Sequence, residues 1–263
     1  MGVVNVTPDS FSDGGLFIDP AAAARQVGQM VADGADLIDI GAESTRPGSQ
    51  PVPDGEQIRR LEPVLHAVAR EASQAVLSID TTRAAVAEMA FDHGVTLAND
   101  ISAGRDDPAM LPLVARRGVG VCLMHMLGTP ATMQDNPQYG EVVAEVRQFL
   151  EDRVVAAVAA GIERHRILID PGIGFGKTDA HNLELLRRLS ELTAAGQPIL
   201  VGTSRKGFIG RITGETDPTA RQFGTAATIC WAIANAADVV RVHDVKPMRQ
   251  VVDMTMAIRA RNA

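Results

Sequence analysis

Residues 167–177 read ILIDPGIGFGK, a short apolar run that ends in an acidic residue and continues into a glycine-rich loop. The apolar residues at its start are consecutive rather than alternating, which is typical of a parallel strand covered on both faces. Gly172, Gly174 and Gly176 permit backbone angles and close approaches that other residues avoid. The segment therefore predicts a buried strand that delivers Asp170 to one edge of a parallel sheet.

Similar apolar runs recur along the chain, each followed by a helix-like stretch. Eight such units in 263 residues favour an α/β (TIM) barrel of eight parallel strands over an open doubly wound sheet. No linker divides residues 1–263, so we expect one domain. The predicted strands are 3–6, 37–40, 76–79, 96–98, 120–124, 167–169, 199–201 and 239–242, and the clearest helices are 20–32, 55–72, 140–160 and 218–234.

Two helix starts carry capping signals. Asp19 precedes Pro20 at the first helical position, and Asp54 precedes Gln57 with the spacing of a capping box. The segments from strand to helix are long after the first, second, fifth and seventh strands, whereas the return segments are short. Active sites of such barrels are built at the C-terminal ends of the strands, so the long loops indicate the working face.

Composition excludes several classes of protein. The net charge of −7 gives no general attraction to a polyphosphate backbone, so we expect no nucleic acid partner. The chain has no signal-like start and no apolar run long enough for a bilayer, so we expect a cytoplasmic protein without membrane association. Cys122 and Cys230 lie in apolar or helix-like stretches, and we expect both in the core rather than in a disulfide or zinc site.

Nearly every predicted strand ends on a polar side chain. A single Asp or Asn in such a place could be a helix cap for the next segment. A whole set inside an apolar barrel mouth is what a flat, nitrogen-rich heterocycle needs for edge-on hydrogen bonds. The set comprises Asn5, Asp39, Asp80, Asn99, His125, Asp170, Arg241 and His243.

Basic residues form a second group at the same rim. Thr45 and Arg46 lie in the second loop, Lys206 follows the seventh strand, and Arg241 and His243 end the eighth. Guanidinium groups placed there in an acidic chain favour a bound anion, because the fork of Arg matches phosphate oxygens. Ordinary ion pairs with rim carboxylates are the alternative. The chain has no Gly-x-x-x-x-Gly-Lys motif, which excludes a P-loop.

Seven motifs occur in order: MGVVNVTPDSFSDGG, IDIGAESTRPGS, SIDTTR, NDIS, DPGIGFGK, GTSRKGFIG and RVHDV. Over essentially its whole length the chain thereby resembles the bacterial dihydropteroate synthases, a family of pterin-binding barrels. The resemblance implies a transferase of folate biosynthesis. Such an enzyme condenses 6-hydroxymethyl-7,8-dihydropterin pyrophosphate with p-aminobenzoate to give 7,8-dihydropteroate and pyrophosphate.

The resemblance also implies roles for single residues and an assembly. The expected assembly is a homodimer, and inhibition by sulfonamides is expected because they mimic p-aminobenzoate. Many members carry Ser where this chain has Gly207, so one side-chain contact to the benzoate carboxylate is missing. The implied catalytic residues are Asp170, Lys206, Arg241 and His243. The implied pterin contacts are Asp80, Asn99, Asp170, Lys206 and Arg241, with Ile101 and Met124 as apolar walls. The implied pyrophosphate contacts are Asn5, Thr45, Arg46, Arg241 and His243, and Asn5 would also bind Mg2+ as the cofactor. The implied p-aminobenzoate site lies at Phe175 and Lys206. The loop residues expected to close over the site are Phe11, Asp13, Ser44 and Pro47.

Three rival functions use the same kind of barrel. A pterin-dependent methyltransferase would keep the Asp and Asn contacts but would have no use for pyrophosphate anchors. An aldolase would use Lys206 as a Schiff-base nucleophile, although the position of Lys206 beyond the strand end argues against that role. A catalytically silent pterin-binding barrel would bind the pterin without turnover, although the intact polar and basic residues argue against loss of activity.

Overall fold

The structure is a computed structural model that describes residues 1–7, 19–44 and 48–260. Within these residues strands and helices alternate, and a strand is present at each predicted position. The strands are β1 (Gly2–Asn5), β2 (Ile38–Gly41), β3 (Leu77–Asp80), β4 (Leu97–Asp100), β5 (Gly120–Met124), β6 (Ile167–Asp170), β7 (Leu200–Val201) and β8 (Val239–Val240). The α-helices are α1 (Pro20–Ala32), α2 (Asp54–Glu71), α3 (Ala84–Asp92), α4 (Met110–Arg117), α5 (Val142–Ala159), α6 (Asp179–Arg187), α7 (Gly207–Thr213), α8 (Gln222–Ala234) and α9 (Val245–Arg259), and short 3-10 helices are η1 (Arg164–Arg166), η2 (Leu189–Ala195) and η3 (Pro218–Ala220).

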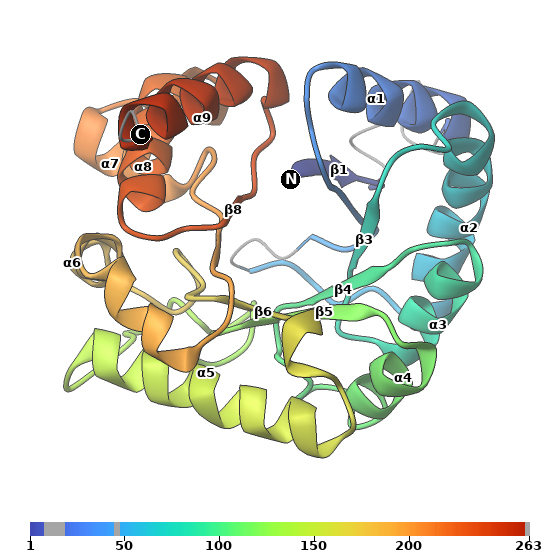
Figure 1. Ribbon diagram of the computed structural model, residues 1–263, viewed down its shortest axis with the longest axis horizontal. Coiled ribbons are helices and arrows are strands. Elements are labelled where there is room, and N and C mark those ends of the chain that lie inside the picture. Colours follow the sequence, from blue (N-terminus) through green and yellow to red (C-terminus); the bar gives the residue numbers. More distant parts are fainter. Residues whose placement is uncertain (8–18, 45–47, 261–263) are drawn as a thin grey trace.

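The strand pairs are parallel, and together the strands form a ring. β1 to β6 make one sheet in chain order, and β7 pairs with β8. Single bridges join the two sheets at both seams, between Ile169 and Ile199 and between Gly2 and Val242. Figure 1 shows the helices encircling these strands. The predicted TIM barrel is therefore confirmed.

Several strands extend further than their apolar runs. β3, β4 and β6 end on Asp80, Asp100 and Asp170, which an apolar pattern places beyond the strand. Asn99 and Asp100 keep their partners in the ladder between β4 and β5. Ladder hydrogen bonds join backbone groups and do not depend on the polarity of the side chain. Asp80, Asn99 and Asp170 are consequently held by regular strands rather than by loops.

One predicted helix cap is confirmed and the other is wrong. Asp19 is the N-cap of α1, where its side chain accepts a hydrogen bond from the Ala21 amide, and Pro20 is the first helical residue. Asp54 is instead the first residue of α2, after Pro53 at the N-cap position. A capping box requires an N-cap side chain that accepts a hydrogen bond, and Pro53 at the N-cap has none.

Gln57 has a different role from the one that the capping box implied. It is fully buried, and its amide donates to Glu43 at 3.0 Å and to the Val52 carbonyl at 2.9 Å. The Val52 amide donates to the same Glu43 carboxylate at 3.0 Å. This clamp ties the start of the loop after β2 to its end.

Three further predictions about the second half of the chain are wrong. Cys122 is buried as expected, but Cys230 is exposed on α8, where its sulfur accepts a hydrogen bond from Thr255 at 3.2 Å. The helix predicted at 218–234 divides into η3 and α8, and the long loop expected after β7 contains α7. The long segment after β5, residues 125–141, is confirmed, whereas those expected after β1 and β2 include residues outside the described ranges.

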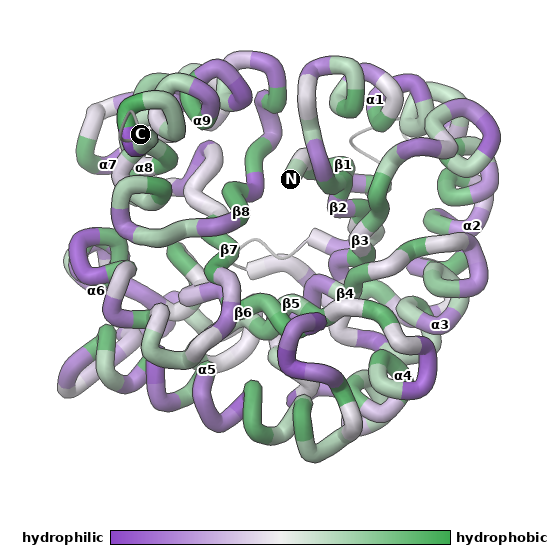
Figure 2. The backbone as a smooth tube through the Cα atoms, viewed as in Figure 1, coloured by the Kyte–Doolittle hydropathy of each residue, from purple (hydrophilic) through white to green (hydrophobic). Residues whose placement is uncertain are grey.

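The core lies between the strands and the inner faces of the helices. Val4, Ile40, Ile79 and Leu123 are fully buried in one apolar cluster, together with helix residues such as Leu65. Figure 2 shows hydrophobic residues along the inner strands and an alternation of polar and apolar residues along the outer helices. Among the helices of the described ranges, none is both long and apolar enough to cross a membrane.

The loop after β6 lies very close to the segment that follows β5. Gly172 has a φ of 66°, in the left-handed region. A Cβ atom on Gly172 would lie 1.9 Å from the carbonyl oxygen of His125. Glycine is required at this position for backbone conformation and for space.

Replacing Gly172 by Ala should therefore destabilise the protein far more than the matched replacement of Gly196. Gly196 also has a positive φ, of 69°, but nothing lies within 4 Å of its added Cβ. Gly196→Ala should cost only the left-handed conformation, about 1–2 kcal/mol. Gly172→Ala should exceed that loss of unfolding free energy by about 2 kcal/mol or more. Urea unfolding measures both values, and equal losses would contradict the close approach.

Candidate active site

Arg241, which directly follows β8, links several strands at the barrel mouth. Its Nε donates to Asp39 at 2.7 Å and its Nη2 donates to Asp80 at 2.9 Å. Asn99 on β4 donates to the same Asp39 oxygen at 2.9 Å. We refer to Asp39, Asp80, Asn99 and Arg241 as the Arg241 group. These four rim residues, predicted to converge from separate strands, form one hydrogen-bonded unit.

The Arg241 group contains one cation and two carboxylates in a nearly closed environment. Asp39 is fully buried, and the Arg241 side chain is 22% exposed. Burial disfavours the charge of Arg241, but the carboxylates of Asp39 and Asp80 raise its pKa. Burial raises the pKa of Asp80 despite the attraction of Arg241, and the neighbouring Asp39 acts in the same direction as burial. Arg241 thus makes the ion pairs that the sequence left open as an alternative to anion binding.

Asp170 and Lys206 are two further ionisable residues at the mouth, and they are of opposite charge. Asp170 ends β6, and its Oδ1 accepts a hydrogen bond from the Gly172 amide at 2.7 Å. Burial raises the pKa of Asp170 to about 6, against the opposing effects of that amide and of Lys206. Burial lowers the pKa of Lys206 to about 8, and Asp170 opposes that shift. The two residues therefore affect each other's charge, as expected for one site.

Phe175 and Lys206 meet beside an apolar wall. The Lys206 Nζ lies 4.1 Å from the centroid of the Phe175 ring, which is a cation–π distance. Phe175 packs against a cluster that contains Ile101, Met124 and two further methionines. The predicted apolar walls and the predicted aromatic contact consequently lie in the same region.

His243 is oriented by Ser204, which follows β7. The His243 amide donates to the Ser204 hydroxyl oxygen at 3.2 Å, and the ring Nδ1 lies 3.0 Å from the same oxygen. The Ser204 hydroxyl can donate to Nδ1 or accept from it, and when it donates, the neutral ring carries its proton on Nε2. Burial, with Arg205 and Arg241, lowers the pKa of His243 to about 4. The ring is therefore neutral at neutral pH and can donate a hydrogen bond rather than supply a charge.

Arg205 and Lys206 are neighbours in the chain with different partners. Arg205 pairs with Asp244 through two hydrogen bonds of 2.6 and 3.1 Å, and it has a positive φ of 61°. Lys206 is the N-cap residue of α7 and contacts Phe175. The left-handed turn at Arg205 separates the two side chains, so that one braces the start of α9 and the other joins the mouth.

Asn5 ends β1 and is half-buried. Its carboxamide oxygen is a hard ligand of the kind that Mg2+ accepts. In the part of the chain that the structure describes, no group of three or more His, Cys, Asp or Glu side chains could hold a metal. A single carboxamide oxygen fits a magnesium ion that takes its other ligands from phosphate oxygens and water.

Five predicted residues fall outside the described ranges. They are Phe11, Asp13, Thr45, Arg46 and Pro47. Ser44, predicted to take part in loop closure, is described and exposed at the edge of one of these gaps.

Three residues in the structure have roles that the sequence does not assign. Asp39 is only one member of the predicted ring, but it accepts hydrogen bonds from both Arg241 and Asn99. Ser204 orients His243, and Lys177 is buried next to His125. The apolar neighbours of Asp39 signal that its side chain is inside the barrel. Nothing in the sequence indicates the partners of Ser204 or Lys177.

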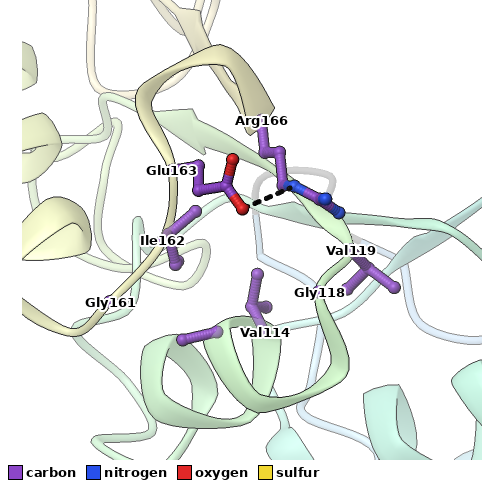
Figure 3. Close-up of a pocket in the computed structure, with 8 residues that line it drawn as sticks. Val114, Gly118, Val119, Gly161, Ile162, Glu163 and Arg166 are labelled. Atoms are coloured by element: carbon purple, nitrogen blue, oxygen red, sulfur yellow. Dashed lines mark ion pairs between the residues drawn. The ribbon is translucent and has the colours of Figure 1, made fainter.

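A small pocket lies at the opposite end of the barrel, where α4 leads into β5 and η1 leads into β6 (Figure 3). Val114, Val119 and Ile162 line it, and Glu163 and Arg166 form an ion pair at its edge. None of the described rim residues is among its lining residues. Active sites of such barrels lie at the C-terminal ends of the strands, so we do not regard this pocket as the site.

The barrel mouth can therefore bind a molecule with three distinct parts. Buried carboxylates and an amide suit the N–H groups of a flat heterocycle. The guanidinium of Arg241 and the Nε2 of His243 suit an anion. The apolar wall and the Phe175 ring suit an aromatic ring.

Comparison with known proteins gives a consistent result. Residues 1–243 match the family model described as pterin binding enzyme. A dihydropteroate synthase from Synechocystis sp. is 46% identical over 98% of this chain and 89% of its own length. One from Neisseria meningitidis serogroup C is 47% identical over 94% of this chain and 87% of its own length.

Solved structures agree with the sequence relatives. The Xanthomonas albilineans dihydropteroate synthase with 4-aminobenzoic acid has a TM-score of 0.92 and 43% identity, covering 99% of this chain and 92% of that chain. The Yersinia pestis dihydropteroate synthase in a sulfonamide drug complex has a TM-score of 0.92 and 41% identity, covering 98% of this chain and 93% of that chain. The chain therefore belongs to the pterin-binding enzyme family and, within it, to the dihydropteroate synthases.

Proposed function

We propose that the barrel mouth is where this chain joins p-aminobenzoate to 6-hydroxymethyl-7,8-dihydropterin pyrophosphate. The amine nitrogen forms a bond to the pterin methylene carbon while the bond from that carbon to the pyrophosphate oxygen breaks. The electron pair leaves with pyrophosphate, and the attacking nitrogen loses a proton to solvent. The Arg241 group carries this proposal, because it gathers polar side chains from four strands at one opening.

Asp80, Asn99 and Asp170 would bind the polar edge of the pterin. As the carbon–oxygen bond breaks, positive charge develops on the pterin methylene, and a nearby carboxylate stabilises it. Asp170 is suited to this because its pKa, raised by burial to about 6, still leaves it ionised at neutral pH. No protein nucleophile is required for the displacement.

Arg241, His243 and Asn5 would hold the pyrophosphate, with Thr45 and Arg46 added by family resemblance. The guanidinium fork of Arg241 matches two phosphate oxygens, and His243 can donate from Nε2. Magnesium, when bound, would add positive charge at the leaving oxygens, and Asn5 would hold it together with those oxygens and water. These groups would stabilise negative charge that grows only as the bond breaks.

Phe175 and Lys206 would flank the p-aminobenzoate ring, and sulfonamides would compete for the same place. Support comes from the two relatives whose structures contain 4-aminobenzoic acid and a sulfonamide drug. Gly207 is the first residue of α7, and an added Cβ would lie 3.0 Å from Arg211, which pairs with Asp179 at 2.5 Å. A side chain at position 207 would therefore require a small shift of the exposed end of Arg211.

We also propose a homodimer of single-domain, cytoplasmic chains that binds small molecules and no nucleic acid. α8 and α9 expose several large apolar side chains, among them Phe223 at 88%, Trp231, Met254 and Ile258. Exposed apolar groups gathered on adjacent helices mark protein interfaces. The net charge of −7 supports the absence of a nucleic acid partner.

The rival functions predict different behaviour. A methyltransferase would not need Arg241 and His243 as anion anchors. The lowered pKa of Lys206, about 8, would suit a Schiff-base nucleophile, and trapping with borohydride and a carbonyl substrate would reveal one. A silent barrel would bind the pterin substrate without releasing pyrophosphate.

The wild-type enzyme should release pyrophosphate only when the pterin pyrophosphate, p-aminobenzoate and Mg2+ are all present. Arg241→Ala should lower kcat by about 100-fold or more, because it removes the main cation that faces the leaving group. Arg25→Ala, at an exposed arginine of α1, is the matched control and should stay within about twofold of wild type. Binding without release would support the silent barrel, and near-normal kinetics of Arg241→Ala would remove that residue from the site.

The pH profile of kcat/KM for the pterin substrate should have two limbs. The rate should rise as Asp170 loses its proton near its pKa of about 6, because only the carboxylate stabilises the methylene. It should fall as Lys206 loses its proton near its pKa of about 8. Lys206→Arg keeps its charge at high pH, so its basic limb should move upward while its acid limb stays. A basic limb that is unchanged in Lys206→Arg would show that another group titrates.

A further inference from the structure

Lys177, at the end of the glycine-rich loop after β6, is a buried lysine whose hydrogen-bond partners are neutral, with Asp170 and Lys206 as the nearby charges. It is only 2% exposed. Its Nζ lies 2.9 Å from His125 Nδ1, 3.0 Å from the Phe175 carbonyl oxygen and 3.4 Å from the His125 carbonyl oxygen. An ammonium has three N–H donors, and each has an acceptor. A buried cation is costly even when it is hydrogen-bonded, so a specific role is needed to explain this one.

His125 gives Lys177 an acceptor that is fixed to the barrel wall. The His125 amide donates to the Asp170 carbonyl at 2.9 Å, which ties it to β6. Its ring packs edge-on against Phe149 of α5, with 4.8 Å between the centroids. Burial lowers the pKa of Lys177 to about 7, against the attraction of Asp170. When Lys177 is an ammonium it can only donate, so His125 Nδ1 then accepts. Burial, together with the charge of Lys177, lowers the pKa of His125 to about 2, in agreement with this assignment.

The carbonyl that Lys177 binds is one of three successive loop carbonyls held by side chains. Gln134 donates to the Gly174 carbonyl at 2.8 Å, and Tyr139 donates to the Gly176 carbonyl at 2.7 Å. The Gln134 bond is exposed and Tyr139 is half-buried, so water competes for both. Lys177 holds the middle carbonyl, that of Phe175, from inside the protein.

Phe175 is the residue whose ring contacts Lys206 at 4.1 Å. The φ angles of Gly174 and Gly176, 84° and 63°, are positive, which glycine adopts without strain. Because glycine also adopts other conformations readily, contacts from the surroundings must fix the shape of the loop. Loss of the Lys177 contact would leave the Phe175 carbonyl without its buried donor, while the Phe175 amide keeps its hydrogen bond to the Gly172 carbonyl at 3.0 Å.

We propose that Lys177 is a positioning residue that, through the Phe175 carbonyl and His125, holds the Phe175 ring against Lys206 and so shapes the arylamine subsite. This inference rests on the proposed function, because it assigns the ring to the p-aminobenzoate side of the reaction. Lys177 itself would not touch either substrate. The lysine should therefore affect the affinity for p-aminobenzoate much more than the affinity for the pterin substrate.

Steady-state kinetics of Lys177→Met test the proposal, because Met keeps the length of the side chain and removes its three donors. KM for p-aminobenzoate should rise about tenfold or more, while KM for the pterin pyrophosphate stays within about twofold and kcat falls by less than about fivefold. Lys177→Gln keeps N–H donors on a shorter side chain and should give an intermediate KM. Lys246→Met makes the same chemical change at an exposed lysine of α9 and should change none of these values.

A double-mutant cycle with Phe175→Leu separates positioning from a general structural role. If Lys177 acts through Phe175, Lys177→Met should add no more than about twofold to KM for p-aminobenzoate in the Phe175→Leu background. Independent, multiplying effects would overturn the proposal. Equal shifts of both KM values would also overturn it. So would thermal unfolding experiments that show neither Lys177 variant to be folded. An inactive wild-type enzyme would refute the proposed function and the inference with it, whereas an active one with unshifted KM values in Lys177→Met would refute the inference alone.

Discussion

The site depends on one constraint, which is that a single guanidinium serves two buried or nearly buried carboxylates. Arg241 lies between Asp39 and Asp80, and Asn99 donates to the same Asp39 oxygen as Arg241, while the other Asp39 oxygen is buried without a hydrogen-bond partner among the described residues. A buried carboxylate without a partner would be strongly destabilising, so the strands that carry these residues must keep their register around Arg241. The bridge between Gly2 and Val242 helps to set that register, because it joins the strand next to Arg241 to β1. Closure of the barrel therefore brings the residues of the mouth together.

The hydrogen bonds between Arg241, Asp39 and Asp80 also allow these residues to exchange partners when a ligand binds at the mouth. Two carboxylates compete for one cation, so an incoming anion can take over part of the hydrogen bonding of Arg241 and leave Asp80 for the N–H groups of a heterocycle. His243 contributes a neutral donor because burial keeps its pKa low. The Phe175 ring and the apolar wall complete the site on the side of β4 to β6. Anion, heterocycle and aromatic ring can thus be held together without a covalent intermediate.

Much of this architecture can be predicted from the sequence, for reasons that are local. Continuous apolar runs predict parallel strands, and the polar residue at the end of each run predicts the mouth, because strand direction places all these ends on one rim. The predicted capping box at Asp54 is wrong because Pro53 takes the N-cap position. The prediction that Cys230 is buried is wrong because α8 is apolar on its outer surface as well, so apolar neighbours do not identify the side that faces the core. Partners such as Ser204 for His243, or His125 for Lys177, could not be predicted, since residues far apart in sequence meet only when the ring closes.

A crystal structure of the enzyme with 6-hydroxymethylpterin pyrophosphate and Mg2+ tests the central claim most directly. We predict that Arg241 keeps its Nε bond to Asp39 while its terminal nitrogen moves from Asp80 to the pyrophosphate, and that Asp80, Asn99 and Asp170 contact the pterin ring. A complex in which Arg241 still bridges both carboxylates, with the pyrophosphate bound elsewhere, would contradict the account.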